Sequence, residues 1–296
     1  MRRAFAGLGL LAALGVAAGL WLTRTDPLPE GTMAGLTGDP EAGEQVFWAA
    51  GCASCHSDAE AEGEARLVLS GGQAFPSDFG TFRAPNVSMH PEHGIGSWDA
   101  DDFANAVQRG IAPDGGHYYP VFPYAAYALA EAQDIADLWA FWQTLPASDV
   151  PNQPHDVGFP FSIRRGVGLW KRLYLPDDFA LPDPPDPEVA RGRYLSEALG
   201  HCAECHTPRD ALGGLDRSRW LSGAPNPSGR GRIPAITPDE LTWSRSEIAQ
   251  YLADGLTPEF DSAGGHMVSV IRNLAHLSDA DRAAIAAYLK AVPPSG

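Results

Sequence analysis

Two short motifs carry cysteine and histidine side chains in the same spacing. Each motif has two cysteines three positions apart and a histidine directly after the second cysteine. The residues are Cys52, Cys55 and His56 in the first motif, and Cys202, Cys205 and His206 in the second. This spacing is typical of c-type haem attachment, in which both thiols form thioethers with the porphyrin edge and the histidine binds the iron. Because the two motifs contain all four cysteines of the chain, we expect two covalently bound haem c groups.

Paired cysteines have two other common uses, and both agree less well with this pattern. The pairs of a zinc site usually lie about 15–20 residues apart, whereas here the separation is 202 − 55 = 147 positions. Structural disulfides can form in an exported chain, but they would not require a histidine after each pair. A zinc-stabilised interaction module therefore stays a third interpretation of the chain, after two haem-based ones.

The segments around the two motifs resemble each other, which predicts a tandem repeat. Asp39-Pro40-Glu41 and Asp186-Pro187-Glu188 each have the order of a helix N-cap, a first-turn proline and a first-turn acid. Trp98 and Trp243 each open a predicted helix that reaches a glycine twelve positions later. We therefore predict an all-α chain with an N-terminal segment at 1–25, a first haem domain at 39–147, a proline-rich linker at 148–186 and a second haem domain at 187–296.

A haem that transfers electrons in the low-spin state needs a second axial ligand, and a thioether there raises the reduction potential. Of the four methionines, Met267 stands in the loop before the last predicted helix, 61 positions after His206. This loop contains Gly264-Gly265-His266-Met267, which we align with Gly115-Gly116-His117-Tyr118 of the first half. Met267 is therefore the predicted sixth ligand of the second haem.

The N-terminal segment has the pattern of a membrane anchor. Two arginines follow Met1, and an uncharged apolar run of 19 residues then extends from Ala4 to Leu22. As a helix this run would be about 28 Å long, close to the ~30 Å hydrocarbon core of a bilayer. A cleaved signal peptide has similar regions, but we find no convincing small-Xaa-small cleavage site. The arginines would keep the amino end in the cytoplasm, so we expect an inner-membrane protein with both haem domains in the periplasm.

The net charge of −16 is unevenly distributed. Residues 39–145 carry 3 − 16 = −13, whereas residues 187–296 carry 11 − 13 = −2. An acidic chain of this kind is unsuited to nucleic acid, which binds basic surfaces, but its field would steer a basic protein partner. The linker contains a basic stretch at 164–172, which we expect either to bridge the domains or to contact a partner.

Each half of the chain is similar to a class I cytochrome c domain, and the whole resembles the membrane-anchored dihaem cytochrome c subunits that serve periplasmic dehydrogenases. The resemblance extends from Asp39 to the carboxyl end. Besides the two haem motifs, it rests on Pro85-Asn86-Val87-Ser88, Gly94-Ile95-Gly96-Ser97-Trp98, Tyr119-Pro120-Val121-Phe122-Pro123-Tyr124 and Gly265-His266-Met267. It implies electron transfer from a catalytic dehydrogenase subunit, through two haems, to a quinone, a cytochrome or an oxidase. It also implies that Trp98 and Trp243 pack beside the haems and hydrogen-bond propionates, with ordinary core packing as the alternative.

The first half departs from the pattern of these subunits at the sixth ligand. Many relatives have methionine at the position of Phe122, and others have it at the position of Leu129, but this chain has neither. Met89 is the spare methionine, and His117 is the nearest histidine in the ligand loop. We expect Met89 as the sixth ligand of the first haem, with His117, a five-coordinate iron or the other histidines as alternatives.

A five-coordinate first haem would be compatible with an enzyme. The rival interpretation is therefore a dihaem peroxidase or sulfur-compound oxidase with the first haem as its catalytic centre. We find no strong signature of a nucleophile, a general base or a phosphate-binding loop. The expected function is therefore electron transfer rather than catalysis, with a redox protein as the donor and a separate acceptor.

Overall fold

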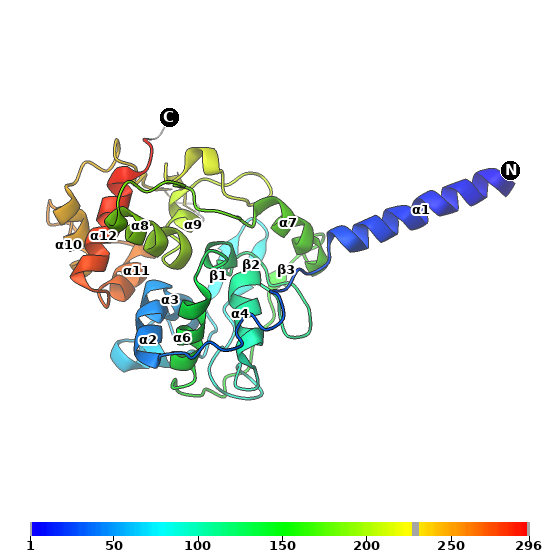
Figure 1. Ribbon diagram of the computed structural model, residues 1–296, viewed down its shortest axis with the longest axis horizontal. Helices are drawn as coiled ribbons and strands as arrows, with labels where there is room; N and C mark the ends of the chain where they lie inside the picture. The colour runs from blue at the N-terminus through cyan, green and yellow to red at the C-terminus, as the bar shows by residue number, and fades with distance from the viewer. Residues whose placement is uncertain (1, 227–230, 295–296) are drawn as a thin grey trace.

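The computed structural model describes residues 2–226 and 231–294, and for residues 2–4 and 6 it describes the backbone alone. The predicted segments at 1–25 and 187–296 therefore include positions that lie outside the described residues. Figure 1 shows a body made mainly of helices, from which one long N-terminal helix projects.

The N-terminal helix α1 (Arg2–Leu22) leaves the body without packing on it along most of its length (Figure 1). Its large apolar side chains from Phe5 onward are exposed. The segment after α1 follows the first domain, where the amide of Leu28 donates to Asn105 Oδ1 at 2.9 Å and Met33 is buried. Among the helices that the structure describes, none is long and apolar enough to cross a membrane.

The first domain begins with the pair of short helices that carries the first motif. Its helices are α2 (Pro40–Ala49), α3 (Cys52–His56), the 3-10 turn η1 (Gly63–Leu67), α4 (Ala100–Arg109), α5 (Tyr124–Tyr127) and α6 (Ala132–Trp142). Its strands β1 (Ala74–Ser77) and β2 (Gly80–Arg83) pair antiparallel, and β3 (Asp156–Val157) from the linker pairs with β2.

The second domain repeats the order of the first after a linker that contains η2 (Arg164–Gly166) and α7 (Val167–Tyr174). Its helices are α8 (Pro187–Arg193), the π-helical turn η3 (Tyr194–Leu199), α9 (Ala203–His206), η4 (Arg217–Arg219), α10 (Arg245–Asp254), α11 (Met267–Leu274) and α12 (Asp279–Ala291). Its two strands, β4 (Ala224–Pro225) and β5 (Arg232–Ile233), form an antiparallel pair.

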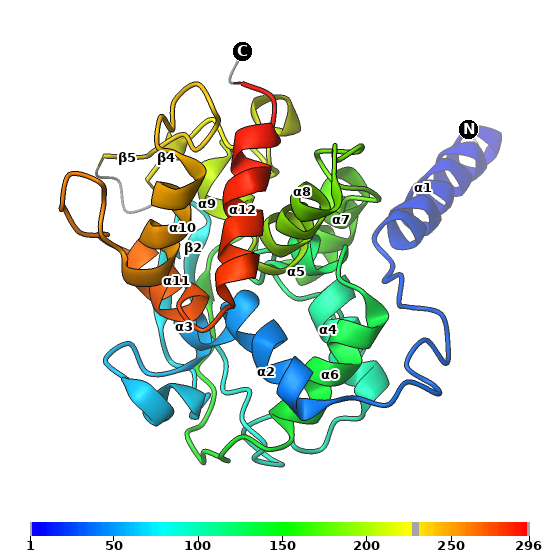
Figure 2. The same ribbon diagram turned by 60° about the vertical axis from the view of Figure 1, so that its left-hand side comes forward.

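Figure 2 shows α2 beside α6 and α8 beside α12. In each pair the two helices meet at a glycine. A Cβ on Gly43 would lie 1.9 Å from the carbonyl oxygen of Asp137, and one on Gly192 would lie 1.8 Å from that of Ala284. No side chain fits such a gap, so glycine lets the two backbones touch at the same place in both domains. The buried residues around these crossings belong to one contiguous apolar core that spans both domains.

The predicted helix starts are confirmed at α2 and α8, where Asp39 and Asp186 cap the first turn and a proline follows. The helices predicted to open at Trp98 and Trp243 instead begin two residues later, at Ala100 and Arg245. The reason is local, because Asp99 and Ser244 are N-caps whose side chains accept hydrogen bonds from the third residue of each helix. Both helices end at a left-handed glycine as expected.

The mostly helical fold agrees with the all-α prediction only in part, because residues 74–83 form a β-hairpin. Phe75 and Phe82 face each other across its two strands, and the ring of Phe82 is buried beside Tyr119. Cross-strand aromatic pairs of this kind stabilise short hairpins. The linker therefore starts as an added strand on the first domain rather than as a free tether.

Candidate haem sites

Each haem motif forms a single helical turn that begins at a left-handed residue. Gly51, with φ of 69°, precedes α3, and His201, with φ of 40°, stands at the same place before Cys202. The four cysteines are unpaired. Burial raises the pKa of Cys52 to about 12 and that of Cys202 to about 11, so both thiols are held neutral in the folded chain.

The histidines of the two motifs are oriented in the same way. His56 Nδ1 lies 3.0 Å from the carbonyl oxygen of Pro85, and His206 Nδ1 lies 2.8 Å from that of Pro234. Because a carbonyl oxygen can only accept, Nδ1 carries the proton and Nε2 keeps its lone pair. A histidine that binds a metal typically donates its other ring N–H to such a partner. Burial also lowers the pKa of both imidazoles, which favours the neutral form that can bind iron.

A second pair of matching hydrogen bonds fixes the loop beyond each motif. The carbonyl oxygen of His56 accepts from the amide of Gly71 at 2.7 Å, and that of His206 accepts from Gly223 at 2.7 Å. The residues of each motif therefore fit haem c, with two thiols on one helical turn and an imidazole nitrogen free for the iron. In the part of the chain that the structure describes, no three His, Cys, Asp or Glu side chains gather to hold a metal ion. The zinc interpretation thus lacks a ligand set there.

The ligand loops of the two domains share a hydrogen-bond pattern that sets their alignment. In the first loop the amide of Ala112 donates to Gly116, and that of Tyr118 donates to Gly110. The corresponding donors in the second loop are Thr257, to Asp261, and Ala263, to Gly255. Tyr118 thus corresponds to Ala263, and the predicted alignment of Tyr118 with Met267 is wrong.

Continuing this register by four residues places Phe122 at the position of Met267. Both side chains are partly buried and pack against the apolar core. A phenyl ring has no lone pair for iron, so the ligand loop of the first domain offers no sulfur ligand where the second domain has one. The first haem must obtain its sixth ligand elsewhere or do without one.

His117 and Met89, the two predicted candidates for that ligand, lie in different surroundings. His117 stands at the place of Ser262 in the shared register and is buried, with Nε2 3.1 Å from the carbonyl oxygen of Thr23. Its Nδ1 meets no hydrogen-bond partner within the described residues. Met89 is partly buried against the same core as Phe122. It lies four residues after Pro85, whose carbonyl holds His56.

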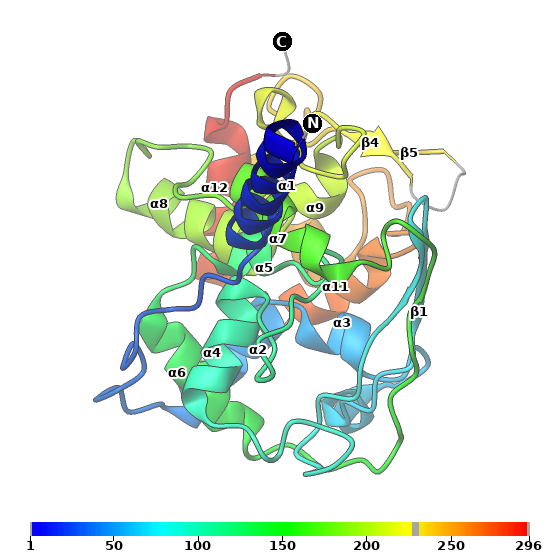
Figure 3. The ribbon, with the colours of Figure 1, turned by 90° about the vertical axis from the view of Figure 1, so that its right-hand side faces the viewer.

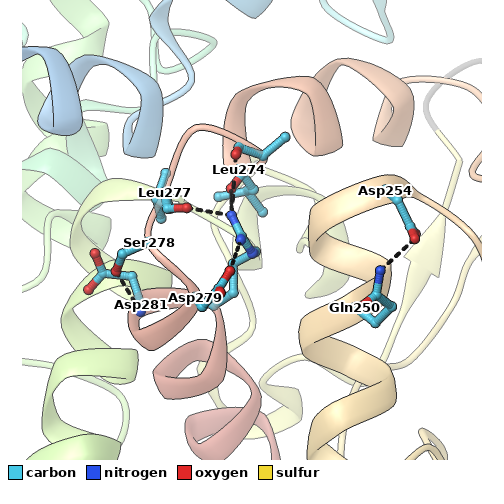
Figure 4. A network of polar contacts seen from close by, with 9 residues as sticks. Gln250, Asp254, Leu274, Leu277, Ser278, Asp279 and Asp281 are labelled. Atoms are coloured by element: carbon cyan, nitrogen blue, oxygen red, sulfur yellow. Dashed lines mark hydrogen bonds and ion pairs between the residues drawn. The ribbon is translucent and has the colours of Figure 1, made fainter.

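The helix that starts at Met267 is held at its other end by Arg282. The Nη1 of this buried guanidinium donates to the carbonyl oxygens of Leu274 at 3.1 Å and Ala275 at 3.3 Å, and also to that of Leu277. Its Nη2 contacts Asp279, and Ser278 caps α12 by accepting from the amide of Asp281 (Figure 4). These bonds satisfy the free carbonyls at the end of α11 and fix the turn between α11 and α12, at the end of α11 opposite Met267.

Trp98 and Trp243 are half-buried at the same position in each domain, just before α4 and α10. The ring of Trp243 packs on Tyr251, with centroids 5.2 Å apart. Within the described residues, no protein group accepts a hydrogen bond from either indole N–H, in contrast to Trp142 and Trp220, whose N–H groups have partners. Both indoles are therefore free to donate to a bound group.

The two haem motifs lie against each other across the domain interface, which the sequence did not predict. A Cβ on Gly51 would lie 3.3 Å from Asn273 Nδ2 and 3.6 Å from His201 Nε2. Asn273 is buried and donates to Ser54 Oγ, inside the first motif, at 2.7 Å. Its Oδ1 accepts from the guanidinium of Arg66. One asparagine of α11 therefore ties the second domain to the first haem motif.

Electrostatic and aromatic contacts confirm that the motifs are close. The pKa of Cys55 is raised to about 11 by burial and then by the neighbouring thiol of Cys205 in the other motif. Tyr127 packs its ring on His201, with centroids 5.8 Å apart, and its hydroxyl donates to the carbonyl oxygen of Ala50 at 2.7 Å. The attachment edges of the two haem sites therefore face one shared interface.

Comparison with known proteins identifies both halves. A family profile described as cytochrome c matches residues 40–146 and 189–293. The chain is 55% identical over 294 residues to a protein of Cereibacter sphaeroides named "Diheme cytochrome c-type", and the match covers 99% of both chains.

Two further relatives are named as parts of dehydrogenases. The chain is 35% identical to the "Fructose dehydrogenase cytochrome subunit" of Gluconobacter japonicus, over 85% of this chain and 52% of that one. It is 33% identical to the "Gluconate 2-dehydrogenase cytochrome c subunit" of Pantoea cypripedii, over 84% of this chain and 58% of that one. The chain thus spans little more than half the length of these two subunits.

Proposed function

The chain belongs to the cytochrome c family and carries two covalently bound haem c groups, and from this premise we propose that it conducts electrons from a dehydrogenase subunit to a separate acceptor. Haem iron supplies the chemistry by gaining and losing one electron at a time. The observation that carries the proposal is the approach of the two haem motifs, where Asn273 of the second domain donates to Ser54 inside the first motif and the thiols of Cys55 and Cys205 are neighbours. An electron that enters one haem site is therefore close to the other haem site.

The chain's own residues have separate tasks in this proposal. The thiols of Cys52, Cys55, Cys202 and Cys205 anchor the two porphyrin edges. His56 and His206 are the axial ligands, each aimed by a proline carbonyl. The protein's work is to orient the two groups, exclude water and tune their potentials.

Met267 is the proposed sixth ligand of the second haem, and Met89 that of the first. Support for Met267 is its place at the head of α11, a helix whose other end is fixed by Arg282. Support for Met89 is its packing against the apolar core and its place four residues after Pro85, whose carbonyl holds His56. His117 stays the alternative, because its Nε2 donates to Thr23 and its Nδ1 has no partner within the described residues. Trp98 and Trp243 are proposed as propionate donors, supported by their free indole N–H groups and their matched positions.

The proposed partner is the catalytic subunit of a dehydrogenase. Support comes from the relatives that are named as cytochrome subunits of dehydrogenases. The acidic first domain, with a charge of 3 − 16 = −13 over residues 39–145, would attract a basic docking surface on that subunit. The acceptor would be a quinone, a cytochrome or an oxidase.

We also propose that the N-terminal segment anchors the chain in the inner membrane with both haem domains in the periplasm. Support comes from the uncharged run from Ala4 to Leu22. The projection of α1 away from the body is a second support (Figure 1). Haem attachment to exported cysteines on the oxidising side would follow from this arrangement.

The test of the conduit is co-purification from native membranes in mild detergent, following the haem absorbance. A catalytic subunit should accompany the chain and reduce both haems when its substrate is added. The proposal fails if the cytochrome is purified alone and its first haem promptly binds carbon monoxide in stoichiometric amount. The enzyme alternative, which would require such an open first haem, is not favoured by relatives that are named cytochrome subunits.

A further inference from the structure

Exposed apolar side chains outside α1 are concentrated in one short segment of the linker. Eleven large apolar residues outside α1 are exposed among the described residues, and five of them fall between positions 159 and 173. These five, which we call the linker patch, are Phe159, Phe161, Ile163, Leu169 and Leu173. Their exposed fractions range from 46% to 83%. A cluster of this kind on a monomer usually marks a binding surface.

The charge of this segment is opposite to that of the whole chain. Residues 157–176 contain four basic residues and no acidic one, whereas the chain carries −16. The basic residues are Arg164, Arg165, Lys171 and Arg172, and the three arginines are exposed. Apolar and basic residues on one exposed segment are typical of a helix that lies at the surface of an anionic membrane.

Helix α7 is held in place by contacts on its other faces. Lys171 Nζ donates to the carbonyl oxygens of Arg109 at 2.5 Å and Gly110 at 2.7 Å, which ties α7 to the end of α4. Trp170 and Tyr174 bind the second domain, through the carbonyl oxygen of Leu212 at 3.1 Å and Asp210 Oδ2 at 2.7 Å. The exposed face of α7 is therefore rigidly presented and is not a frayed end.

The face that carries the patch also holds the end of α1. Arg165 donates to the carbonyl oxygen of Leu20 at 2.8 Å, and Arg172 donates to that of Leu22 at 2.7 Å. Leu169 follows Arg165 by one helical turn, and Leu173 follows Leu169 by one more, so all three lie on one side of the segment. Figures 1 and 3 show α7 at the point where α1 leaves the body.

The aromatic residue at the end of α1 agrees with this placement. The guanidinium of Arg172 lies over the Trp21 ring, 5.1 Å from its centroid, and that of Arg24 lies at 5.4 Å. Tryptophan beside arginine is the usual composition of the zone between acyl chains and headgroups. If α1 enters a bilayer, this zone passes through Trp21 and therefore along the neighbouring face of α7.

We propose that the linker patch rests on the bilayer surface, with Phe159, Leu169 and Leu173 among the acyl chains and the three arginines at anionic phosphates. This inference rests on the proposed N-terminal anchor. The contact would hold the body in one orientation against the membrane, so that the haem domains keep a fixed height above it. A single anchor helix with a free tether would leave that orientation undefined.

The experiment places the full-length holoprotein in nanodiscs that contain phosphatidylglycerol with a photoactivatable acyl chain. After illumination, lipid adducts are located by peptide mass spectrometry. We expect adducts in α1 and between residues 159 and 173. In the variant Phe159→Ser/Leu169→Ser/Leu173→Ser, the yield of linker adducts should fall at least fivefold while the yield in α1 is unchanged.

Val150→Ser is the matched control, because Val150 is 43% exposed but lies outside the linker patch. It should leave both yields unchanged, and both variants should retain their haem absorbance. Adducts in α1 without adducts in the linker would overturn this inference and leave the anchor standing. Absence of adducts from α1 would overturn the anchor itself. The inference would also be contradicted if the yield of linker adducts stayed the same in the triple variant. A co-purified protein subunit that covers the patch in place of lipid would contradict it as well.

Discussion

The two motif histidines are prepared for iron by contacts that lie outside the motifs. Pro85 and Pro234 stand 29 and 28 positions after their histidines, and their carbonyl oxygens fix the ring orientation in both domains. A partner of this kind sets the tautomer and raises the basicity of the ligand. We therefore place the proposed difference between the two haems on the other side of the iron, at the position shared by Met267 and Phe122.

Replacing Met267 with leucine should remove the proposed sulfur ligand of the second haem. Leucine fills a similar volume but cannot bind iron, so the potential of that haem should fall by on the order of 0.1 V, within the ~0.8 V range set by axial ligands. The measurement is a spectroscopic redox titration. Met33→Leu is the control, because Met33 is buried beside the first domain. An unchanged potential in Met267→Leu would exclude Met267 as the ligand.

Replacing Met89 with leucine tests the first haem in the same way. If Met89 is the sixth ligand, the variant should lose the low-spin absorbance of one haem and gain carbon monoxide binding at that haem. The first haem is already open if the unaltered protein binds carbon monoxide at one site. In that case neither Met89 nor His117 binds its iron.

At the scale of elements, each domain is held together by a close contact between its first and last helices. Gly43→Ala and Gly192→Ala should each destabilise the fold by about 1–3 kcal/mol, because the new methyl overlaps a carbonyl of the crossing helix. Gly264→Ala is the control, since no atom lies within 4 Å of its Cβ position. The free energy of unfolding is measured by denaturant titration of the holoproteins. Equal stability of all three variants would contradict the crossing geometry.

The helical elements could be predicted largely from sequence, because their signals are local. Asp39 and Asp186 mark helix starts through capping, and Gly110 and Gly255 mark ends. The ligand loops could not be aligned in the same way. Gly115 and Phe260 occupy the same left-handed position, with φ of 80° and 63°. Glycine is the usual marker of that position, so a phenylalanine there misled the alignment by four residues.

The contact between the haem motifs could not be predicted from the sequence either, but the reason differs from that for the ligand loops. His201 and Asn273 are single polar residues at an interface, and neither belongs to a periodic pattern. Their role depends on how two finished domains pack. The hairpin at 74–83 was missed because its strands have only four residues each and are stabilised by aromatic contacts to Tyr119.

At the scale of the whole molecule, Asn273 should couple the two domains. Asn273→Ala removes the acceptor of Arg66 Nη2 and the donor to Ser54 Oγ, and should cost about 2 kcal/mol of stability. It should also slow electron transfer between the haems within one chain. Asn105→Ala is the control, since Asn105 bonds the tether at Leu28 instead. Loss of stability without any change in that rate would assign Asn273 a purely structural role.

The measurement that tests the account most directly is electron transfer between the two haems of one molecule. Less than one electron per holoprotein is injected by a light pulse, and the absorbance of both haems is followed in time. Because the two motifs share one interface, the electron should equilibrate between them at a rate that does not depend on protein concentration. A rate proportional to concentration would mean that electrons pass between molecules, which would contradict an intramolecular path through the two sites.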